Sequence, residues 1–341
     1  MWLTCSSIGR KFVMALTGTC LVLFLTFHVA MNAVALWSPA AYNAICGFLG
    51  ANWYALVASM GLALLFVVHI IYALWLTVQN RRARGNDRYR VTAHQPGVEW
   101  SSKNMLVLGI VVVAFLVVHM IQFWAKMQLT ELLSHNPADW TQVEGAPAAP
   151  EFGSLYLQLA FQQIWTPIVY IIGFIALWLH MNHGIWSMMQ TYGWNNDTWM
   201  KRLKCISLWW TSIVVGLFVI QAVVFTVLAR QNYFTENEAL QEQYAEYWGE
   251  RAEALNESFT AEFAHALKQA PEGADRNQVL AAFFADPKCV EFINAAKVIT
   301  EAAEKQCPKL TVPAVESLAQ SAADVEQSIE YAKSMTPNQN N

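Results

Sequence analysis

Long apolar runs separated by short polar segments dominate the first two thirds of the chain. Five runs are long enough to cross a bilayer, which takes about 20 residues of α-helix. They cover roughly residues 12–37, 53–78, 105–125, 165–189 and 208–229. Many have Trp near one end, as interfacial anchors do. The first run is longer than the 7–15 apolar residues of a signal peptide, so we expect a retained helix. The pattern predicts a five-helix membrane bundle.

The pattern changes after residue 230. Residues 231–341 hold 18 Asp/Glu and 8 Lys/Arg, whereas residues 1–230 hold 7 and 13. Apolar positions such as Leu280, Phe283 and Phe292 predict short amphipathic helices, with breaks near residues 271–273 and 308–313. The overall composition, 55% hydrophobic and 13% charged, is typical of an integral membrane protein. We therefore expect an all-α chain with a membrane domain, 1–235, and an acidic helical extension outside the membrane, 236–341.

The loop charges predict the topology. The loop after the second run holds five arginines between residues 81 and 90, and the loop after the fourth holds Lys201, Arg202 and Lys204. The first loop carries no charge, and the third carries four acidic residues between 131 and 151. Basic loops stay in the cytoplasm. The N-terminus is therefore expected inside, and the C-terminal extension outside, in the periplasm of a bacterial cell.

One histidine lies inside each of the first four runs: His28, His69, His119 and His180. An ionisable side chain at bilayer depth is rare and by default indicates a functional site. Imidazole is also a common metal ligand. Four such histidines on four helices suggest two bis-histidine haems inside the bundle, although hydrogen bonding within the bundle is the simpler alternative for any single one.

The predicted topology gives each histidine a height. His69 and His180 each lie nine residues from the inner end of their runs, about 14 Å above the cytoplasmic edge. His28 and His119 lie 16 and 14 residues from the inner ends, roughly 21–24 Å up. Matching depths pair His28 with His119 and His69 with His180. His183, one turn from His180, is an alternative ligand that depth does not separate from it.

Three sequence motifs carry a resemblance to a known family. They are SSIGRK at residues 6–11, TFHVAMN around His28, and HMNHGIWSMMQTYGWNN from His180. Together they resemble the di-haem cytochrome b subunit of succinate dehydrogenase and fumarate reductase, in its five-helix, single-polypeptide form. The resemblance covers residues 1–230 or so. In that family a glycine and an aromatic follow the fourth ligand by four and six residues. Gly184 and Trp186 stand there, which favours His180 over His183.

The resemblance implies cofactors, partners and location. His69 and His180 would hold a proximal haem b, and His28 and His119 a distal one. Because the chain has neither a Gly-rich nucleotide fingerprint nor cysteines at iron–sulfur spacing, a flavoprotein and an iron–sulfur subunit would dock on the cytoplasmic side. Menaquinone would exchange electrons near the distal haem. The setting would be the bacterial cytoplasmic membrane, in the respiratory chain and tricarboxylic acid cycle, with no nucleic-acid partner.

Two departures from the family bear on the direction of the reaction. Some quinol-oxidising members carry a glutamate two residues before the fourth histidine, where this chain has Trp178. Segment 38–52 also has no carboxylate, although an acidic residue serves quinol chemistry near there in some relatives. Both absences favour succinate oxidation over fumarate reduction without deciding between them.

Several polar residues near the runs have two interpretations each. Ser7 and Arg10, with Lys11, are topology signals or contacts to a haem propionate, and His183 is a further propionate candidate. Gln122 lies one turn beyond His119 and would meet a quinone carbonyl or bond a neighbouring helix. Gly18, Gly61, Gly109 and Gly173 precede the histidines by seven to ten residues and would fit porphyrin faces or close helix packing.

Cys289 and Cys307 are the two cysteines of the extension. In an oxidising compartment they could form a disulfide, and we expect one, with two free buried thiols as the alternative.

Two other functions compete with the di-haem anchor. The membrane anchors of hydrogenase and formate dehydrogenase are also b-type cytochromes, but they tend to carry two ligand histidines on one helix. A haem-free transporter with polar histidines is the second alternative.

Overall fold

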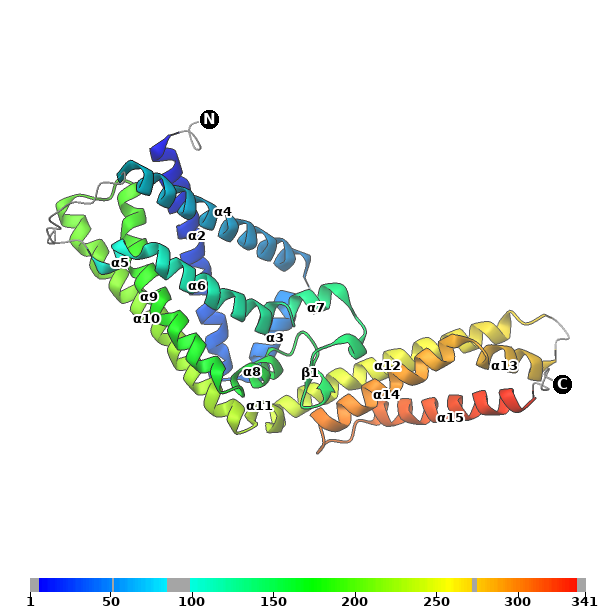
Figure 1. The fold of residues 1–341 in the computed structure, drawn as a ribbon. Helices are drawn as coiled ribbons and strands as arrows, with labels where there is room; N and C mark the ends of the chain where they lie inside the picture. The colour runs from blue at the N-terminus through cyan, green and yellow to red at the C-terminus, as the bar shows by residue number, and fades with distance from the viewer. Residues whose placement is uncertain (1–5, 51, 85–98, 272–274, 336–341) are drawn as a thin grey trace. The chain divides into compact units, whose positions relative to one another are not determined.

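A computed structural model describes residues 6–50, 52–84, 99–271 and 275–335, which are almost entirely α-helical (Figure 1). The all-α prediction is confirmed. The chain forms two compact units. Unit 1 comprises Met1–Gln128 and Glu151–Gln231, and unit 2 comprises Leu129–Pro150 and Asn232–Asn341. Residues 129–150 pack with the C-terminal segment, not with the membrane domain 1–235 expected from the sequence.

Within the described residues, five helices are long and apolar enough to cross a membrane. They are α2 (Ser7–Ala33) continued by η1 (Val34–Leu36), α4 (Trp53–Arg84), α6 (Met105–His119) continued by the π-helical turn η2 (Met120–Trp124), α9 (Trp165–Thr191) and α10 (Asp197–Arg230). The chain is a multi-pass membrane protein.

Two of these helices begin earlier than the apolar pattern indicated. The Gly9 amide donates to Ser6 Oγ at 2.9 Å, so this N-cap starts α2 at Ser7. The Trp199 amide donates to Asn196 Oδ1 at 2.8 Å, which starts α10 at Asp197 rather than near residue 208. Lys201, Arg202 and Lys204 therefore lie on the first turns of α10, and the prediction that they lie in a loop is wrong.

Helix α9 is central to unit 1, where it packs against α2, α6 and α10, while α4 packs against α2. A Cβ on Gly173 would collide with the Phe115 ring, so the glycine permits close approach of α9 and α6. Outward positions stay apolar and exposed, among them Leu64, Ile110 and Ile172. Such a surface suits lipid rather than water. Shorter helices complete the unit: α3 (Pro39–Gly50), α5 (Trp100–Lys103) and α8 (Gly153–Phe161).

Unit 2 is built on three long helices that lie side by side (Figure 1). They are α12 (Glu238–Lys268), α14 (Pro287–Gln306) and α15 (Pro313–Met335). The break expected at residues 308–313 lies between α14 and α15, whereas residues 272 and 273 of the other expected break lie outside the described residues. The expectation of short helices holds for α13 (Arg276–Phe284) but not for these three. The remaining elements are α7 (Gln128–Leu133), which begins at the last residue of unit 1, η3 (Pro137–Asp139), the two-residue hairpin strands β1 (Gln142–Val143) and β2 (Ala146–Pro147), and α11 (Tyr233–Glu236).

The buried positions of α15 recur at spacings of three and four: Val315, Leu318, Ala322, Val325 and Ile329. This is the spacing of a narrow seam between paired helices. The loop between the third and fourth spans supplies Trp140, whose ring lies 6.2 Å from that of the fully buried Trp248 on α12. Gln306 then joins three segments, since the Trp248 indole donates to its Oε1 and its Nε2 donates to Pro147 O, both at 2.8 Å.

The disulfide prediction is wrong. Cys289 lies in the first turn of α14 and Cys307 directly follows its last residue. Along one α-helix that separation is about 27 Å, whereas a disulfide needs Cα atoms within about 7 Å. Both thiols are free and buried, and they donate instead to Phe283 O and Ala303 O.

Candidate functional site

Four helices of unit 1 bring their histidines together in two pairs. The ring of His28 on α2 lies 5.8 Å, centroid to centroid, from that of His119 on α6. The ring of His69 on α4 lies 6.4 Å from that of His180 on α9. The two pairs are those that the depth argument predicted from sequence.

The ring separations fit one metal ion between each pair. An imidazole nitrogen binds a metal at about 2 Å, as it does zinc, so two opposed ligands place their ring centroids roughly 6 Å apart. Among the described residues, no group of three or more His, Cys, Asp or Glu forms a metal site. Two protein ligands suffice for haem iron, because the porphyrin supplies four nitrogens.

Hydrogen bonds orient one imidazole of each pair. His69 Nδ1 lies 3.0 Å from Thr17 Oγ1, and the Thr17 hydroxyl donates to Val13 O. His119 Nδ1 lies 3.2 Å from the Tyr170 hydroxyl. An Nδ1 partner fixes the ring and leaves Nε2 as the ligand atom. His180 Nδ1 is buried and has no hydrogen-bond partner among the described residues.

The two pairs lie at different levels of the bundle. On α2, His28 follows Thr17, which contacts His69, by eleven residues, or about 16 Å of helix. On α9, His180 follows Tyr170, which contacts His119, by ten residues, or about 15 Å. Two helices thus give the same separation. It exceeds the difference of about 7–10 Å expected from the sequence.

Glycines on neighbouring helices face one of the pairs. A Cβ on Gly18 would lie 3.7 Å from His69 Cε1, and a Cβ on Gly109 would lie 3.7 Å from His180 Cε1. Gly61 has nothing within 4 Å at that position, and Gly173 serves helix packing against Phe115. Of the four glycines, Gly18 and Gly109 are those that lie against a histidine ring, where a Cβ would already be in van der Waals contact.

His183 belongs to a different cluster. Its Nδ1 lies 3.5 Å from Glu99 Oε2, its ring packs edge-on to Trp186 at 4.6 Å, and Lys204 Nζ lies 3.1 Å from Glu99 Oε1. Burial alone would raise the pKa of Glu99, but Lys204 and then His183 outweigh it and hold that pKa below its usual value. These contacts tie α9 and α10 to the start of α5.

Gln122 lies within the π-helical turn and joins two helices. The Tyr170 hydroxyl donates to Gln122 Oε1 at 2.9 Å, and Gln122 Nε2 donates to Thr166 Oγ1 at 3.0 Å. Gln122 therefore bonds a neighbouring helix, which is one of the two roles expected from the sequence. Gln122 also lines a cavity of about 380 Å³ beside the His119 helix.

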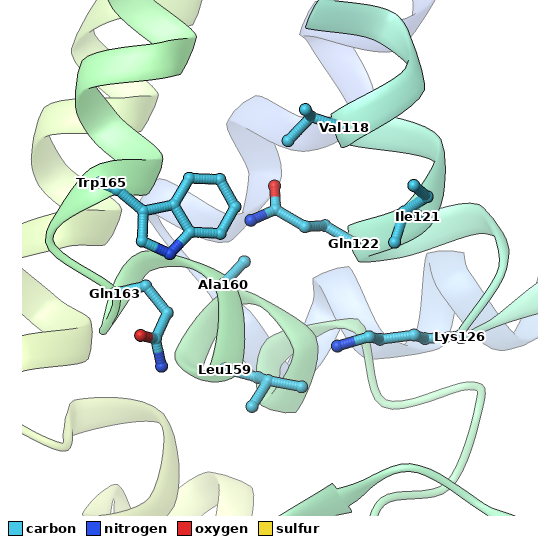
Figure 2. Close-up of a pocket in the computed structure, with 8 residues that line it drawn as sticks. All are labelled: Val118, Ile121, Gln122, Lys126, Leu159, Ala160, Gln163 and Trp165. Atoms are coloured by element: carbon cyan, nitrogen blue, oxygen red, sulfur yellow. The ribbon is translucent and has the colours of Figure 1, made fainter.

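The cavity is mostly apolar with a few polar groups (Figure 2). Its lining is Val118, Ile121, Gln122, Lys126, Leu159, Ala160, Gln163 and Trp165. Figure 2 shows the Gln122 amide directed toward the Trp165 ring, with the Lys126 amine extending toward Leu159. Burial lowers the pKa of Lys126.

The remaining candidates lie on α2 and α9. Ser7 is exposed, whereas Arg10 is buried with its guanidinium 5.4 Å from the Trp75 ring centroid on α4. Arg10 is also two turns before Thr17, on the same side of α2. Trp178, at the family's glutamate position, donates its indole N–H to Ser212 Oγ at 3.0 Å. Arg88 and Arg90 lie outside the described residues.

Sequence reasoning missed Thr17, Tyr170, Thr166 and Lys126. The first three carry hydroxyl groups inside apolar helices, and polar side chains at such positions were the signal that could have found them.

The fold and the site define a class: a multi-pass helical membrane protein with two histidine pairs at two levels. No protein-family model, curated protein or solved structure that was compared with this chain matches it.

Proposed function

We propose that this chain is the membrane-anchor cytochrome b of a succinate:quinone oxidoreductase, either a succinate dehydrogenase or a fumarate reductase. In this role it passes electrons between a cytoplasmic iron–sulfur subunit and menaquinone through two bis-histidine b haems. The observation that carries the proposal is the pairing of His28 with His119 and His69 with His180 at ring separations of 5.8 and 6.4 Å.

The residues of the chain have distinct tasks in this proposal. Haem, when bound, supplies reversible one-electron chemistry. The four histidines bind it, and Thr17 and Tyr170 orient two of them. Gly18 and Gly109 lie beside the rings of His69 and His180, where they place no side chain against the imidazoles. Arg10 offers a buried cation on the His69 side of α2, where a propionate would be neutralised.

The cavity beside His119 supports a quinone site at that level. Its apolar lining suits an isoprenoid quinone, and Gln122, Gln163 and Lys126 offer polar groups to a carbonyl. Gln122 lines the cavity and is connected to His119 through Tyr170 by hydrogen bonds.

The two chain segments that make up unit 2 support the five-span topology. Residues 129–150 follow the third span, and the C-terminal segment follows the fifth, so an odd number of crossings puts both on one side. Their packing into one unit requires this. By the positive-inside rule that side is the periplasm of a bacterial cell, and the N-terminus is cytoplasmic.

The ligand sources separate this proposal from other b-type anchors. Each histidine pair comes from two different helices, α2 with α6 and α4 with α9. Two ligand histidines on one helix, as in the hydrogenase and formate dehydrogenase anchors, are a different arrangement.

Haem content tests the proposal. Protein purified in mild detergent should contain two b haems per chain, measured as the pyridine haemochrome. His69→Ala and His180→Ala should remove one component of the reduced-minus-oxidised spectrum, and His28→Ala and His119→Ala the other. His265→Ala, on α12, is the matched control and should change neither. Wild-type protein with one haem or none would overturn the proposal.

A further inference from the structure

A buried hydrogen-bond chain starts at one histidine of the His28–His119 pair. His119 Nδ1 lies 3.2 Å from Tyr170 Oη, the Tyr170 hydroxyl donates to Gln122 Oε1 at 2.9 Å, and Gln122 Nε2 donates to Thr166 Oγ1 at 3.0 Å. Tyr170, Gln122 and Thr166 are 4%, 8% and 0% exposed. All three side chains are thus largely shielded from solvent.

The chain has a direction. A tyrosine hydroxyl has one proton, and Tyr170 gives it to Gln122 Oε1. Its oxygen is left as an acceptor toward His119, so His119 must carry its proton on Nδ1. The lone pair is then on Nε2, the nitrogen left free to bind a metal.

Tyr170 is itself held rigidly. Its ring meets the rings of Phe115, Phe161 and Phe174 edge-on at 5.0, 5.3 and 5.8 Å between centroids. Each is a favourable aromatic geometry. The hydroxyl position is thus fixed by packing on three sides as well as by Gln122.

We propose that Tyr170 is a positioning residue that fixes the Nδ1-protonated tautomer of His119 and lowers the midpoint potential of the haem bound by His28 and His119. The inference rests on the proposed haem-binding function. A ligand imidazole that donates from Nδ1 is a stronger electron donor at Nε2. Stronger donation stabilises the ferric state, so the potential falls.

The other pair offers an internal comparison. Thr17 does for His69 what Tyr170 does for His119, since its hydroxyl donates to Val13 O and its oxygen is open to His69 Nδ1. Each hydroxyl should therefore act on its own haem alone.

Redox titration of the purified holoprotein, followed by visible absorption and by electron paramagnetic resonance, tests the proposal. Tyr170→Phe should raise the midpoint potential and move the resonance of the haem that His119→Ala abolishes, and leave the other haem unchanged. Thr17→Val should raise the midpoint potential of the haem bound by His69 and His180 and leave the His28–His119 haem unchanged. Tyr244→Phe removes a buried hydroxyl of unit 2, which donates to Phe234 O, and should move neither.

An unchanged potential in Tyr170→Phe, or an equal shift at both haems, would overturn the inference. If the Tyr170→Phe variant fails to bind that haem, the Gln122→Met variant is measured in its place. This substitution removes the acceptor that directs the Tyr170 proton. A raised potential then supports the inference and an unchanged one overturns it. The proposed function fails separately, by the absence of two histidine-dependent haems in wild-type protein.

Discussion

The ring of His69 lies 6.4 Å from the ring of His180, although the two residues stand on α4 and α9, far apart in sequence. Helix α2 takes part in both pairs, because it contributes His28 to one and, through Thr17, a hydrogen bond to the other. The site therefore depends on the packing of four helices, and single residues can be changed to test each part of it.

His183 and His180 should behave differently. His180→Ala removes a proposed ligand and should lose one of two haems. His183→Ala leaves the His69–His180 pair in place and should keep both, because its contacts are to Glu99 and Trp186. Haemochrome content and difference spectra give the measurement. Loss of one haem in His183→Ala, with His180→Ala unaffected, would transfer the ligand role to His183.

The space beside the His69–His180 pair should limit haem binding by that pair. Leucine at Gly18 or Gly109 would place its side chain against a histidine ring, since the Cβ alone lies 3.7 Å from the ring carbon. Either variant should lose most of the haem held by His69 and His180 while keeping the other haem. Gly216→Leu on α10, where nothing lies within 4 Å, is the matched control. Full occupancy of both haems in Gly18→Leu and Gly109→Leu would show that the haem does not use this space.

Gln306 should be essential to unit 2. Replacement by leucine leaves the Trp248 N–H and the Pro147 carbonyl without their partner in a buried region. We expect a loss of roughly 2–4 kcal/mol in the free energy of unfolding of this unit, from two unsatisfied groups. Denaturant titration of the full chain, with resistance of residues 232–335 to protease as the readout, measures it. Gln320→Leu, on the exposed face of α15, should change stability by less than about 0.5 kcal/mol.

Cys289 and Cys307 should both be alkylated without reductant, but slowly. Burial raises the pKa of both thiols, that of Cys307 to about 11, with the charges of Asp286 and Glu262 adding to the effect at Cys289. With a pKa near 11, roughly one thiol in a thousand is ionised at pH 8. Mass spectrometry should find both unmodified after brief treatment of folded protein at pH 8 and both modified in denaturant. A cross-linked peptide containing the two would contradict the single helix α14.

In the proposed complex, the basic helix ends should bind the soluble flavoprotein and iron–sulfur subunits. Arg81 and Arg82 at the end of α4, and Lys201 and Arg202 at the start of α10, are exposed. Reversing these four charges to glutamate should abolish copurification of a flavoprotein and an iron–sulfur subunit, and added salt should weaken it in wild type. The double variant Lys309→Glu and Lys333→Glu in unit 2 is the control. Normal copurification after the four reversals would place the docking surface elsewhere.

The spans and the histidine pairs could be predicted because they follow from one-dimensional rules. Apolar length sets where a helix can cross lipid, and a rise of 1.5 Å per residue converts position into depth. Matching depth was enough to pair His28 with His119. The starts of α2 and α10 were harder to predict, because the caps at Ser6 and Asn196 are local hydrogen bonds outside the apolar runs.

The polar partners of the histidines could not be predicted in this way. Whether Thr17 or Tyr170 reaches an imidazole depends on how the helices rotate about their axes, which packing decides. The disulfide prediction failed for a related reason. Only short helices were expected in this segment, whereas residues 287–306 form an uninterrupted α14 whose buried positions recur at helical spacing.

Unit 2 consists of two chain segments separated by the fourth and fifth spans, so it can form only when both of those spans insert into the membrane. Residues 129–150 leave the ribosome before α9 and α10, and Trp140 gains its partner Trp248 only after both helices have been made. If one of those two spans failed to insert, the loop and the C-terminal helices would be on opposite sides of the bilayer. Trp140 would then lack Trp248 as its packing partner, and unit 2 would not form.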